Sequence, residues 1–494
     1  MRNILSSWGG YIVRLVIAFF FVPFIASEFG DARYGVWVIV FQTINYFSLL
    51  DIGLSSALTR YVSRYLSERD FGRISRTLST SNVLYLIIGS LIFAGVYLFV
   101  ELFFHYFKIS DPAMVEEGKQ ALLVLGAFMA FNSYLLPFGN SFAGFQRQDI
   151  NRFLAVCENI ILVIIMVWLI RRGHGLVALA LAILSISVLK HIAGIVWLKR
   201  LYREVRFSLK DVSAETARTL MGYSKVSFGI TIGWLIIFNT DTFLLGMLSS
   251  SAAAGIYNPA AQLMLYLRNT VNAIGIPLTP AVSHVDAAGR AEQVRSIYHR
   301  GIKYITYLSV LFTVGVVVYA KPFVNLWLPP EFEQTAQVMI ILAFGSAFFL
   351  PQIIGNSVLF GIGQHQYILR TLIFEALGKI LIAIFLVPKH GLWGMAVANT
   401  IPQVILYSTL YPWFISRALG ISLRTIALTG LRSGALATVV TIPAVLIASR
   451  ILPPVTWGAF AVNVLVVVGI AAVPGYLLLE RGDRDKLIGF LKKS

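Results

Sequence analysis

The chain has 494 residues, of which 57% are hydrophobic and only 13% are charged, and its mean hydropathy is +0.78. Soluble globular domains contain about 45–50% apolar residues, so this composition excludes that class and predicts a membrane protein. The formal net charge of +17 could suggest a nucleic-acid partner. The basic residues lie between the apolar runs, as membrane topology requires, so we expect no nucleic acid as a partner.

Apolar segments long enough to cross a bilayer follow one another along almost the whole chain. A transmembrane helix needs about 20 apolar residues, whereas a barrel strand needs about half that number with alternating polarity. The sequence therefore predicts an all-α polytopic membrane protein. We count about fourteen segments of helical length, at residues 7–28, 34–57, 82–104, 118–142, 153–170, 175–198, 219–248, 253–282, 302–324, 336–360, 367–386, 391–415, 424–449 and 456–479.

The basic residues are divided unequally between the two sides of the predicted membrane protein. The termini and the loops after even-numbered segments carry about 26 Lys and Arg, and the opposite loops carry about eight. Such a bias marks the rich side as cytoplasmic. We therefore expect both termini to be cytoplasmic, and we expect the membrane lipids to attract the basic loops as a secondary effect.

A sequence pattern near residue 136 returns near residue 350. The first copy reads Leu136-Pro137 and then Gly139-Asn140-Ser141, and the second reads Leu350-Pro351 and then Gly355-Asn356-Ser357. Upstream, Thr59 and Val62 return as Thr279 and Val282. Repeated halves are typical of transporters, which place a substrate site between the halves.

The repeat predicts a domain organisation of six plus six plus two helices. We expect an N-terminal six-helix bundle at 1–201, a cytoplasmic linker at 202–218, a C-terminal six-helix bundle at 219–418, and two further helices with a cytoplasmic tail at 419–494. Each copy contains an even number of spans, so both copies begin on the same face. The repeat is therefore parallel and not inverted.

Arginines inside the predicted spans are the first candidates for a substrate site. A charged side chain at the bilayer centre costs about 2.5–3.5 kcal/mol, so each should face a partner or a wet cavity. One interpretation places Arg14 and Arg268 across a central cavity, where two guanidinium groups would bind a diphosphate through forked hydrogen bonds. The alternative for Arg14 is a structural pair with Asp51, which lies at a similar depth in the next segment.

Other ionisable residues of the spans are candidates for ion coupling or for structural ion pairs. Glu158 and Glu375 occupy equivalent positions of the repeat, and Lys379 lies one turn after Glu375, a spacing that favours a structural pair. The full set is Asp51, Asp241, Lys190, Glu158, Glu375 and Lys379. The seven histidines are scattered and the single cysteine cannot build a zinc site, so we expect no metal site, no cofactor and no catalytic residues.

Several short motifs resemble a known family. They are Phe29-Gly30 with Tyr34-Gly35 and Trp37, Leu50-Asp51-Ile52-Gly53-Leu54, Asn239 with Asp241 and Leu245-Gly246, and Gly255-Ile256-Tyr257. In these motifs the chain is similar to the polysaccharide transporters of the multidrug/oligosaccharidyl-lipid/polysaccharide exporter superfamily, which include bacterial O-antigen and exopolysaccharide flippases. The similarity extends over nearly the whole chain.

The resemblance implies a V-shaped pair of bundles around a cationic cavity that opens alternately to each side of the bacterial inner (cytoplasmic) membrane. It implies a cargo, an oligosaccharide linked by pyrophosphate to undecaprenol, that moves from the cytoplasmic to the periplasmic leaflet for surface polysaccharide biosynthesis. It places Arg14 and Arg268 where related flippases have cavity arginines. It also implies that polysaccharide polymerase and chain-length machinery are partners.

Two other functions remain open at this stage. A cation-coupled multidrug exporter of the same fold would need an acidic cavity, for which Asp51 and Asp241 are candidates. A membrane glycosyltransferase or polymerase would need long loops with catalytic residues, whereas the predicted outer loops are short.

Overall fold

The computed structural model describes residues 2–47, 54–275, 277–480 and 484, and it describes side chains in these ranges except at 2–14, 56, 222–236 and 238. The described part of the chain is built from helices and contains no strand. The helices are α1 Arg2–Phe47, α2 Leu54–Ser67, α3 Phe71–Leu102, α4 Pro112–Gly144, α5 Gln148–Arg171, α6 Leu176–Leu201, α7 Ala214–Leu248, α8 Ser251–Gly275, α9 Leu278–Ala287, α10 Ala291–Trp327, α11 Thr335–Phe349, α12 Gln352–Gly361, α13 Gln366–Ser408, α14 Leu410–Leu419, α15 Leu423–Ile451 and α16 Trp457–Leu478.

Among the described residues, ten helical stretches are long and apolar enough to cross a bilayer. Two of these stretches, 15–47 and 366–419, each cover the region of two expected segments. Both contain a bend at a glycine, Gly30 with φ 67° and Gly391 with φ 53°, where a side chain would be strained. The predicted class, an all-α polytopic membrane protein, is confirmed. The count of fourteen spans stays a prediction.

Side-chain caps fix the starts of several helices. The carboxylate of Asp70 accepts a hydrogen bond from the backbone N–H of Arg73 at the start of α3, and Asp111 does the same for Ala113 at the start of α4. The hydroxyl of Ser213 accepts from the backbone of α7. Each cap satisfies a backbone donor that has no partner inside the helix.

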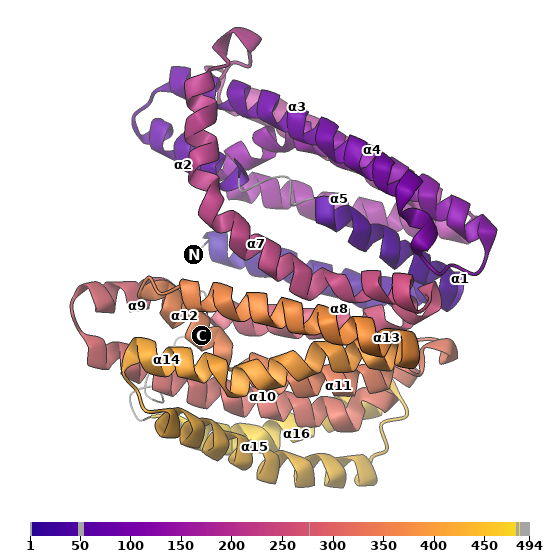
Figure 1. Ribbon diagram of the computed structural model, residues 1–494, viewed down its shortest axis with the longest axis vertical. Coiled ribbons are helices and arrows are strands. Elements are labelled where there is room, and N and C mark those ends of the chain that lie inside the picture. Colours follow the sequence, from indigo (N-terminus) through magenta and orange to yellow (C-terminus); the bar gives the residue numbers. More distant parts are fainter. Residues whose placement is uncertain (1, 48–53, 276, 481–483, 485–494) are drawn as a thin grey trace. The chain divides into compact units, whose positions relative to one another are not determined.

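The helices gather into two units, Met1–Gly255 and Ile256–Ser494, each of which is described by itself. In the first unit α3 packs along α4 (Figure 1), and α7 contacts α1, α2 and α3. In the same unit α4 also packs against α6. In the second unit α10 contacts α11 and α15, α11 contacts α13, and α15 contacts α16. By its contacts α7 therefore belongs to the first unit. The expected limits 1–201, 202–218, 219–418 and 419–494 follow the sequence repeat and stay predictions.

One close contact occurs in both units at equivalent positions of the repeated sequence. A Cβ atom at Gly144 would lie 2.6 Å from the Cβ of Val62, so the end of α4 approaches α2 as closely as only glycine allows. A Cβ atom at Gly361 would lie 2.6 Å from Cγ1 of Val282, where α12 meets α9. Small residues that let two backbones approach are a common device of membrane helices.

Candidate functional site

The second unit holds a buried pair of charged residues on α13. Glu375 and Lys379 are 1% and 0% exposed, and they lie one turn apart on the same helix face. The hydroxyl of Tyr407 donates a hydrogen bond of 2.6 Å to the Glu375 carboxylate. Glu375 and Tyr407 would be about 48 Å apart in a straight helix. The bend at Gly391 therefore folds α13 back on itself and brings them together.

Arg268 of α8 joins this cluster. Its guanidinium carbon lies 4.4 Å from the centre of the Phe349 ring, and its charge is close enough to interact with Glu375. The Phe349 ring in turn meets the Tyr407 ring edge to face, with 5.1 Å between their centres. A desolvated guanidinium over an aromatic face gains about 2 kcal/mol. We call Arg268, Lys379, Glu375, Tyr407 and Phe349 the α8–α13 cluster, in which two basic side chains lie with one acidic side chain.

The first unit holds a corresponding ion pair between α5 and α6. The ammonium group of Lys190 donates a hydrogen bond of 3.0 Å to the carboxylate of Glu158. Glu375 follows Glu158 by 217 residues, and Tyr407 follows Lys190 by the same number. Equivalent positions thus hold a Glu–Lys ion pair in one unit and a Glu–Tyr hydrogen bond in the other. The spacing of 217 residues between Lys190 and Tyr407 is the sequence signal by which Tyr407 could have been found.

The remaining predicted site residues are Asp241, Arg14 and Asp51. Asp241 is buried in α7 beside a hydrogen bond of 2.8 Å between the hydroxyls of Tyr46 and Thr240. Asp51 and the side chain of Arg14 lie outside the described residues. Both the pairing of Arg14 with Asp51 and the cavity position of Arg14 therefore stay predictions.

Comparison with known proteins settles the family. Residues 1–286, more than half of the chain, match the family described as Polysaccharide biosynthesis protein. The chain belongs to this family. Among curated relatives, the uncharacterized membrane protein EpsK of Bacillus subtilis is 22% identical over 85% of this chain and 83% of its own length. The probable flippase AglR of Haloferax volcanii is 21% identical over 81% and 80%, and the putative O-antigen transporter of Shigella flexneri is 19% identical over 84% and 98%.

Solved structures show the fold of this polysaccharide biosynthesis protein. The lipid II flippase MurJ in an inward closed conformation superposes with a TM-score of 0.71, at 14% identity, over 95% of this chain and 96% of MurJ. An inward-facing multidrug resistance transporter of the MATE family gives a TM-score of 0.67, at 17% identity, over 83% of this chain and 99% of that protein. The chain therefore has the fold of transporters of the MOP superfamily, as the sequence motifs predicted.

Proposed function

We propose that this chain is a flippase that carries an oligosaccharide, linked through a diphosphate to undecaprenol, from the cytoplasmic to the periplasmic leaflet by alternating access. Its family and its relatives named as flippases support this function. The charge bias of the loops supports a bacterial inner membrane orientation with both termini in the cytoplasm. Polymerase and chain-length machinery would then receive the cargo at the outer leaflet.

The observation that carries the proposal is the positive charge of the α8–α13 cluster. Arg268 presents a fork of N–H donors that matches phosphate oxygens, and Phe349 holds this fork from one face. The excess charge favours an anionic head group and disfavours the organic cations that a multidrug exporter carries. In this proposal Arg14 supplies a second guanidinium from α1.

Flipping by the purified chain in liposomes tests the role of Arg268. We expect Arg268→Ala to slow the flipping of a fluorescent undecaprenyl-diphosphate oligosaccharide about 10- to 150-fold, the equivalent of one lost charge-assisted contact of about 1.5–3 kcal/mol. Arg268→Lys keeps the charge but loses the forked hydrogen bonds, so its flipping rate should lie between those of wild type and Arg268→Ala. The control is Lys321→Ala, which removes an exposed cation that pairs with Glu333 at the surface.

The same liposomes separate the competing functions. Wild-type rates in Arg268→Ala would remove this arginine from the mechanism. A wild-type chain that leaves the lipid-linked sugar unmoved, but expels a cationic dye when a cation gradient is imposed, would show the exporter function instead. Lengthening of the sugar chain inside the liposomes would indicate a glycosyltransferase.

A further inference from the structure

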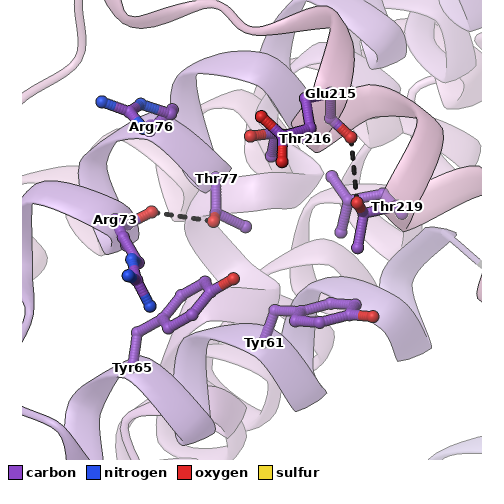
Figure 2. Close-up of a pocket in the computed structure, with 9 residues that line it drawn as sticks. Tyr61, Tyr65, Arg73, Arg76, Thr77, Glu215, Thr216 and Thr219 are labelled. Atoms are coloured by element: carbon purple, nitrogen blue, oxygen red, sulfur yellow. Dashed lines mark hydrogen bonds between the residues drawn. The ribbon is translucent and has the colours of Figure 1, made fainter.

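A polar pocket of about 320 Å³ lies in the first unit between α2, α3 and α7 (Figure 2). Tyr61 and Tyr65 line it from α2, Arg73 and Arg76 from α3, and Glu215 from the first turn of α7. The spacing of four residues in α2 and of three in α3 puts each pair on one helix face. In Figure 2 the arginines lie on one side of the pocket and the α7 residues on the other, with the two tyrosine rings below.

All three helices place their pocket residues just beyond their expected membrane spans. Tyr61 follows the span that ends at residue 57, and Glu215 precedes the span that starts at residue 219. Arg76 precedes the span that starts at residue 82 by about 9 Å of helix. The polar layer on each side of a bilayer is about 5–8 Å thick. The pocket therefore lies at the level of lipid head groups, on the face that the charge bias assigns to the cytoplasm.

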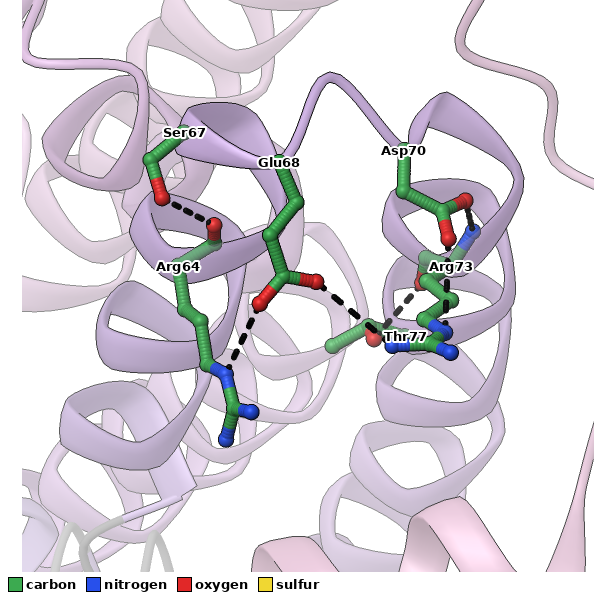
Figure 3. A network of polar contacts seen from close by, with 6 residues as sticks. All are labelled: Arg64, Ser67, Glu68, Asp70, Arg73 and Thr77. Carbon is green, nitrogen blue, oxygen red and sulfur yellow. Dashed lines mark hydrogen bonds and ion pairs between the residues drawn. The ribbon is translucent and has the colours of Figure 1, made fainter.

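The charge of Arg73 is already balanced inside the protein. Its guanidinium lies 3.5 Å from the carboxylate of Glu68 and 3.3 Å from that of Asp70, and Glu68 also pairs with Arg64 (Figure 3). The guanidinium carbon of Arg73 is 5.6 Å from the centre of the Tyr65 ring. Arg73 and Tyr65 therefore form one wall of the pocket and leave the binding of a ligand to other residues.

Arg76 and Glu215 are the charged groups of the pocket that remain for a ligand. Among the described residues, the side chain of neither one forms a hydrogen bond or an ion pair, and both are exposed to the pocket and to solvent. Glu215 lies in the first turn of α7, at the positive end of the helix dipole. Within the part of the chain that the structure describes, the pocket thus presents one cation and one anion that have no side-chain partner, together with the face of Tyr61.

Hydrogen bonds to α3 hold the start of α7 in place. The backbone N–H groups of Arg206, Ser208 and Ser213 donate to the hydroxyls of Ser75, Ser79 and Thr80, at 2.9, 3.1 and 3.1 Å. All three hydroxyl residues are buried. The pocket is therefore formed before a ligand enters it, which lowers the cost of binding.

We propose that this pocket binds the head group of a zwitterionic phospholipid, in which a phosphate and an ammonium group are joined by two carbons. The guanidinium fork of Arg76 binds the phosphate oxygens. The Glu215 carboxylate and the face of Tyr61 bind the ammonium group. A purely anionic head group would bring its charge against Glu215. The volume is at the lower end of the range of small-ligand sites, about 300–1,000 Å³. This site is separate from the α8–α13 cluster and does not depend on the cargo.

Lipid titration of the purified full chain, followed by native mass spectrometry, tests the proposal. The two lipids are phosphatidylethanolamine and phosphatidylglycerol with the same acyl chains. Arg76→Gln should weaken the binding of both about tenfold, because each loses a charge-assisted contact. Glu215→Gln should weaken phosphatidylethanolamine severalfold and strengthen phosphatidylglycerol. The matched control is Arg218→Gln, which removes an exposed charge from the same end of α7 outside the pocket and should change neither.

The outcomes are distinct because the two variants act in opposite directions on phosphatidylglycerol. If Glu215→Gln strengthens both lipids, the zwitterionic ligand is wrong. If Arg76→Gln and Arg218→Gln weaken binding equally, the pocket is not the site. Soluble phosphoethanolamine identifies the source of the head group. We expect it to compete poorly, and competition as strong as that of the lipid would make the free metabolite the ligand. Unchanged elution in size-exclusion chromatography confirms that each variant folds.

Discussion

Breaking the ion pair between α5 and α6 should destabilise the first unit far more than replacing it. At 3.0 Å and an effective dielectric constant of about 20, the Lys190–Glu158 attraction is about 5.5 kcal/mol, which desolvation of both charges largely offsets. Lys190→Met leaves Glu158 as a single charge among apolar helices. We expect a loss of about 3 kcal/mol, at the low end for broken buried pairs because about a fifth of each side chain is exposed.

The double variant Glu158→Leu with Lys190→Met shows whether the loss of stability comes from losing the ion pair or from leaving one charge buried without its partner. Apolar residues of similar volume often replace a buried pair at little or no cost, so we expect the double variant within about 1 kcal/mol of wild type. Unfolding by titration with SDS in mixed micelles, followed by the fluorescence of the nine tryptophans, measures each free energy of unfolding. A double variant that loses the sum of both single losses would refute the reasoning.

The equivalent position in the second unit provides a matched comparison. Tyr407→Phe removes the hydroxyl that donates to Glu375 and leaves the carboxylate in place. A hydrogen bond to a charged group contributes about 1.5–3 kcal/mol, and the SDS titration should show a loss in that range. A loss below about 0.5 kcal/mol would mean that this bond does not stabilise the fold-back of α13.

Three further changes test local contacts by the same titration. Gly144→Ala forces a Cβ into α2 and should cost about 1–3 kcal/mol, whereas Gly139→Ala, where nothing lies within 4 Å, should cost nothing; equal losses would contradict the close approach. Tyr307→Phe removes a buried 2.6 Å hydrogen bond from α10 to a backbone carbonyl of α16 and should cost about 1–2 kcal/mol; an unchanged midpoint would show that this bond does not anchor α16. Arg33→Lys loses the forked contact with Glu117, at 2.6 and 3.0 Å, and should cost about 1 kcal/mol; lysine equal to arginine would mean that charge alone suffices.

Features that depend on composition or on local chain geometry could be predicted from the sequence. The long apolar segments predicted the helical class, and the family resemblance of the motif around Gly30 was confirmed. The positions of the repeat were also informative. Gly144 and Gly361 follow the two copies of the Gly-Asn-Ser pattern by three and four residues, and each makes the contact that only glycine permits. Such contacts can be predicted from the sequence because only glycine, which has no Cβ atom, lets two helix backbones approach so closely.

Features that depend on how distant helices meet could not be predicted. The spacing of Glu375 and Lys379 predicted a pair within one helix, and this pair stays a prediction. The hydrogen bond from Tyr407 to Glu375 could not be predicted, because Tyr407 reaches Glu375 only where α13 folds back at Gly391. The pocket around Arg76 needs three helices in contact, and no periodicity of one helix contains that information. Likewise, the contacts of α7 with α1, α2 and α3 join helices that lie far apart in the sequence.

The hydroxyls of α3 that receive the chain between α6 and α7 determine where this protein could be divided into two separately expressed fragments. A cut at residues 206–213 would disrupt the hydrogen bonds of three backbone N–H groups and leave the buried hydroxyls of Ser75, Ser79 and Thr80 without these donors. The turn at Ser249 and Ser250 comes after α7 and close to the boundary of the two units. Fragments that end and begin there keep all three hydrogen bonds within one fragment, whereas fragments separated at the charged connection lose them.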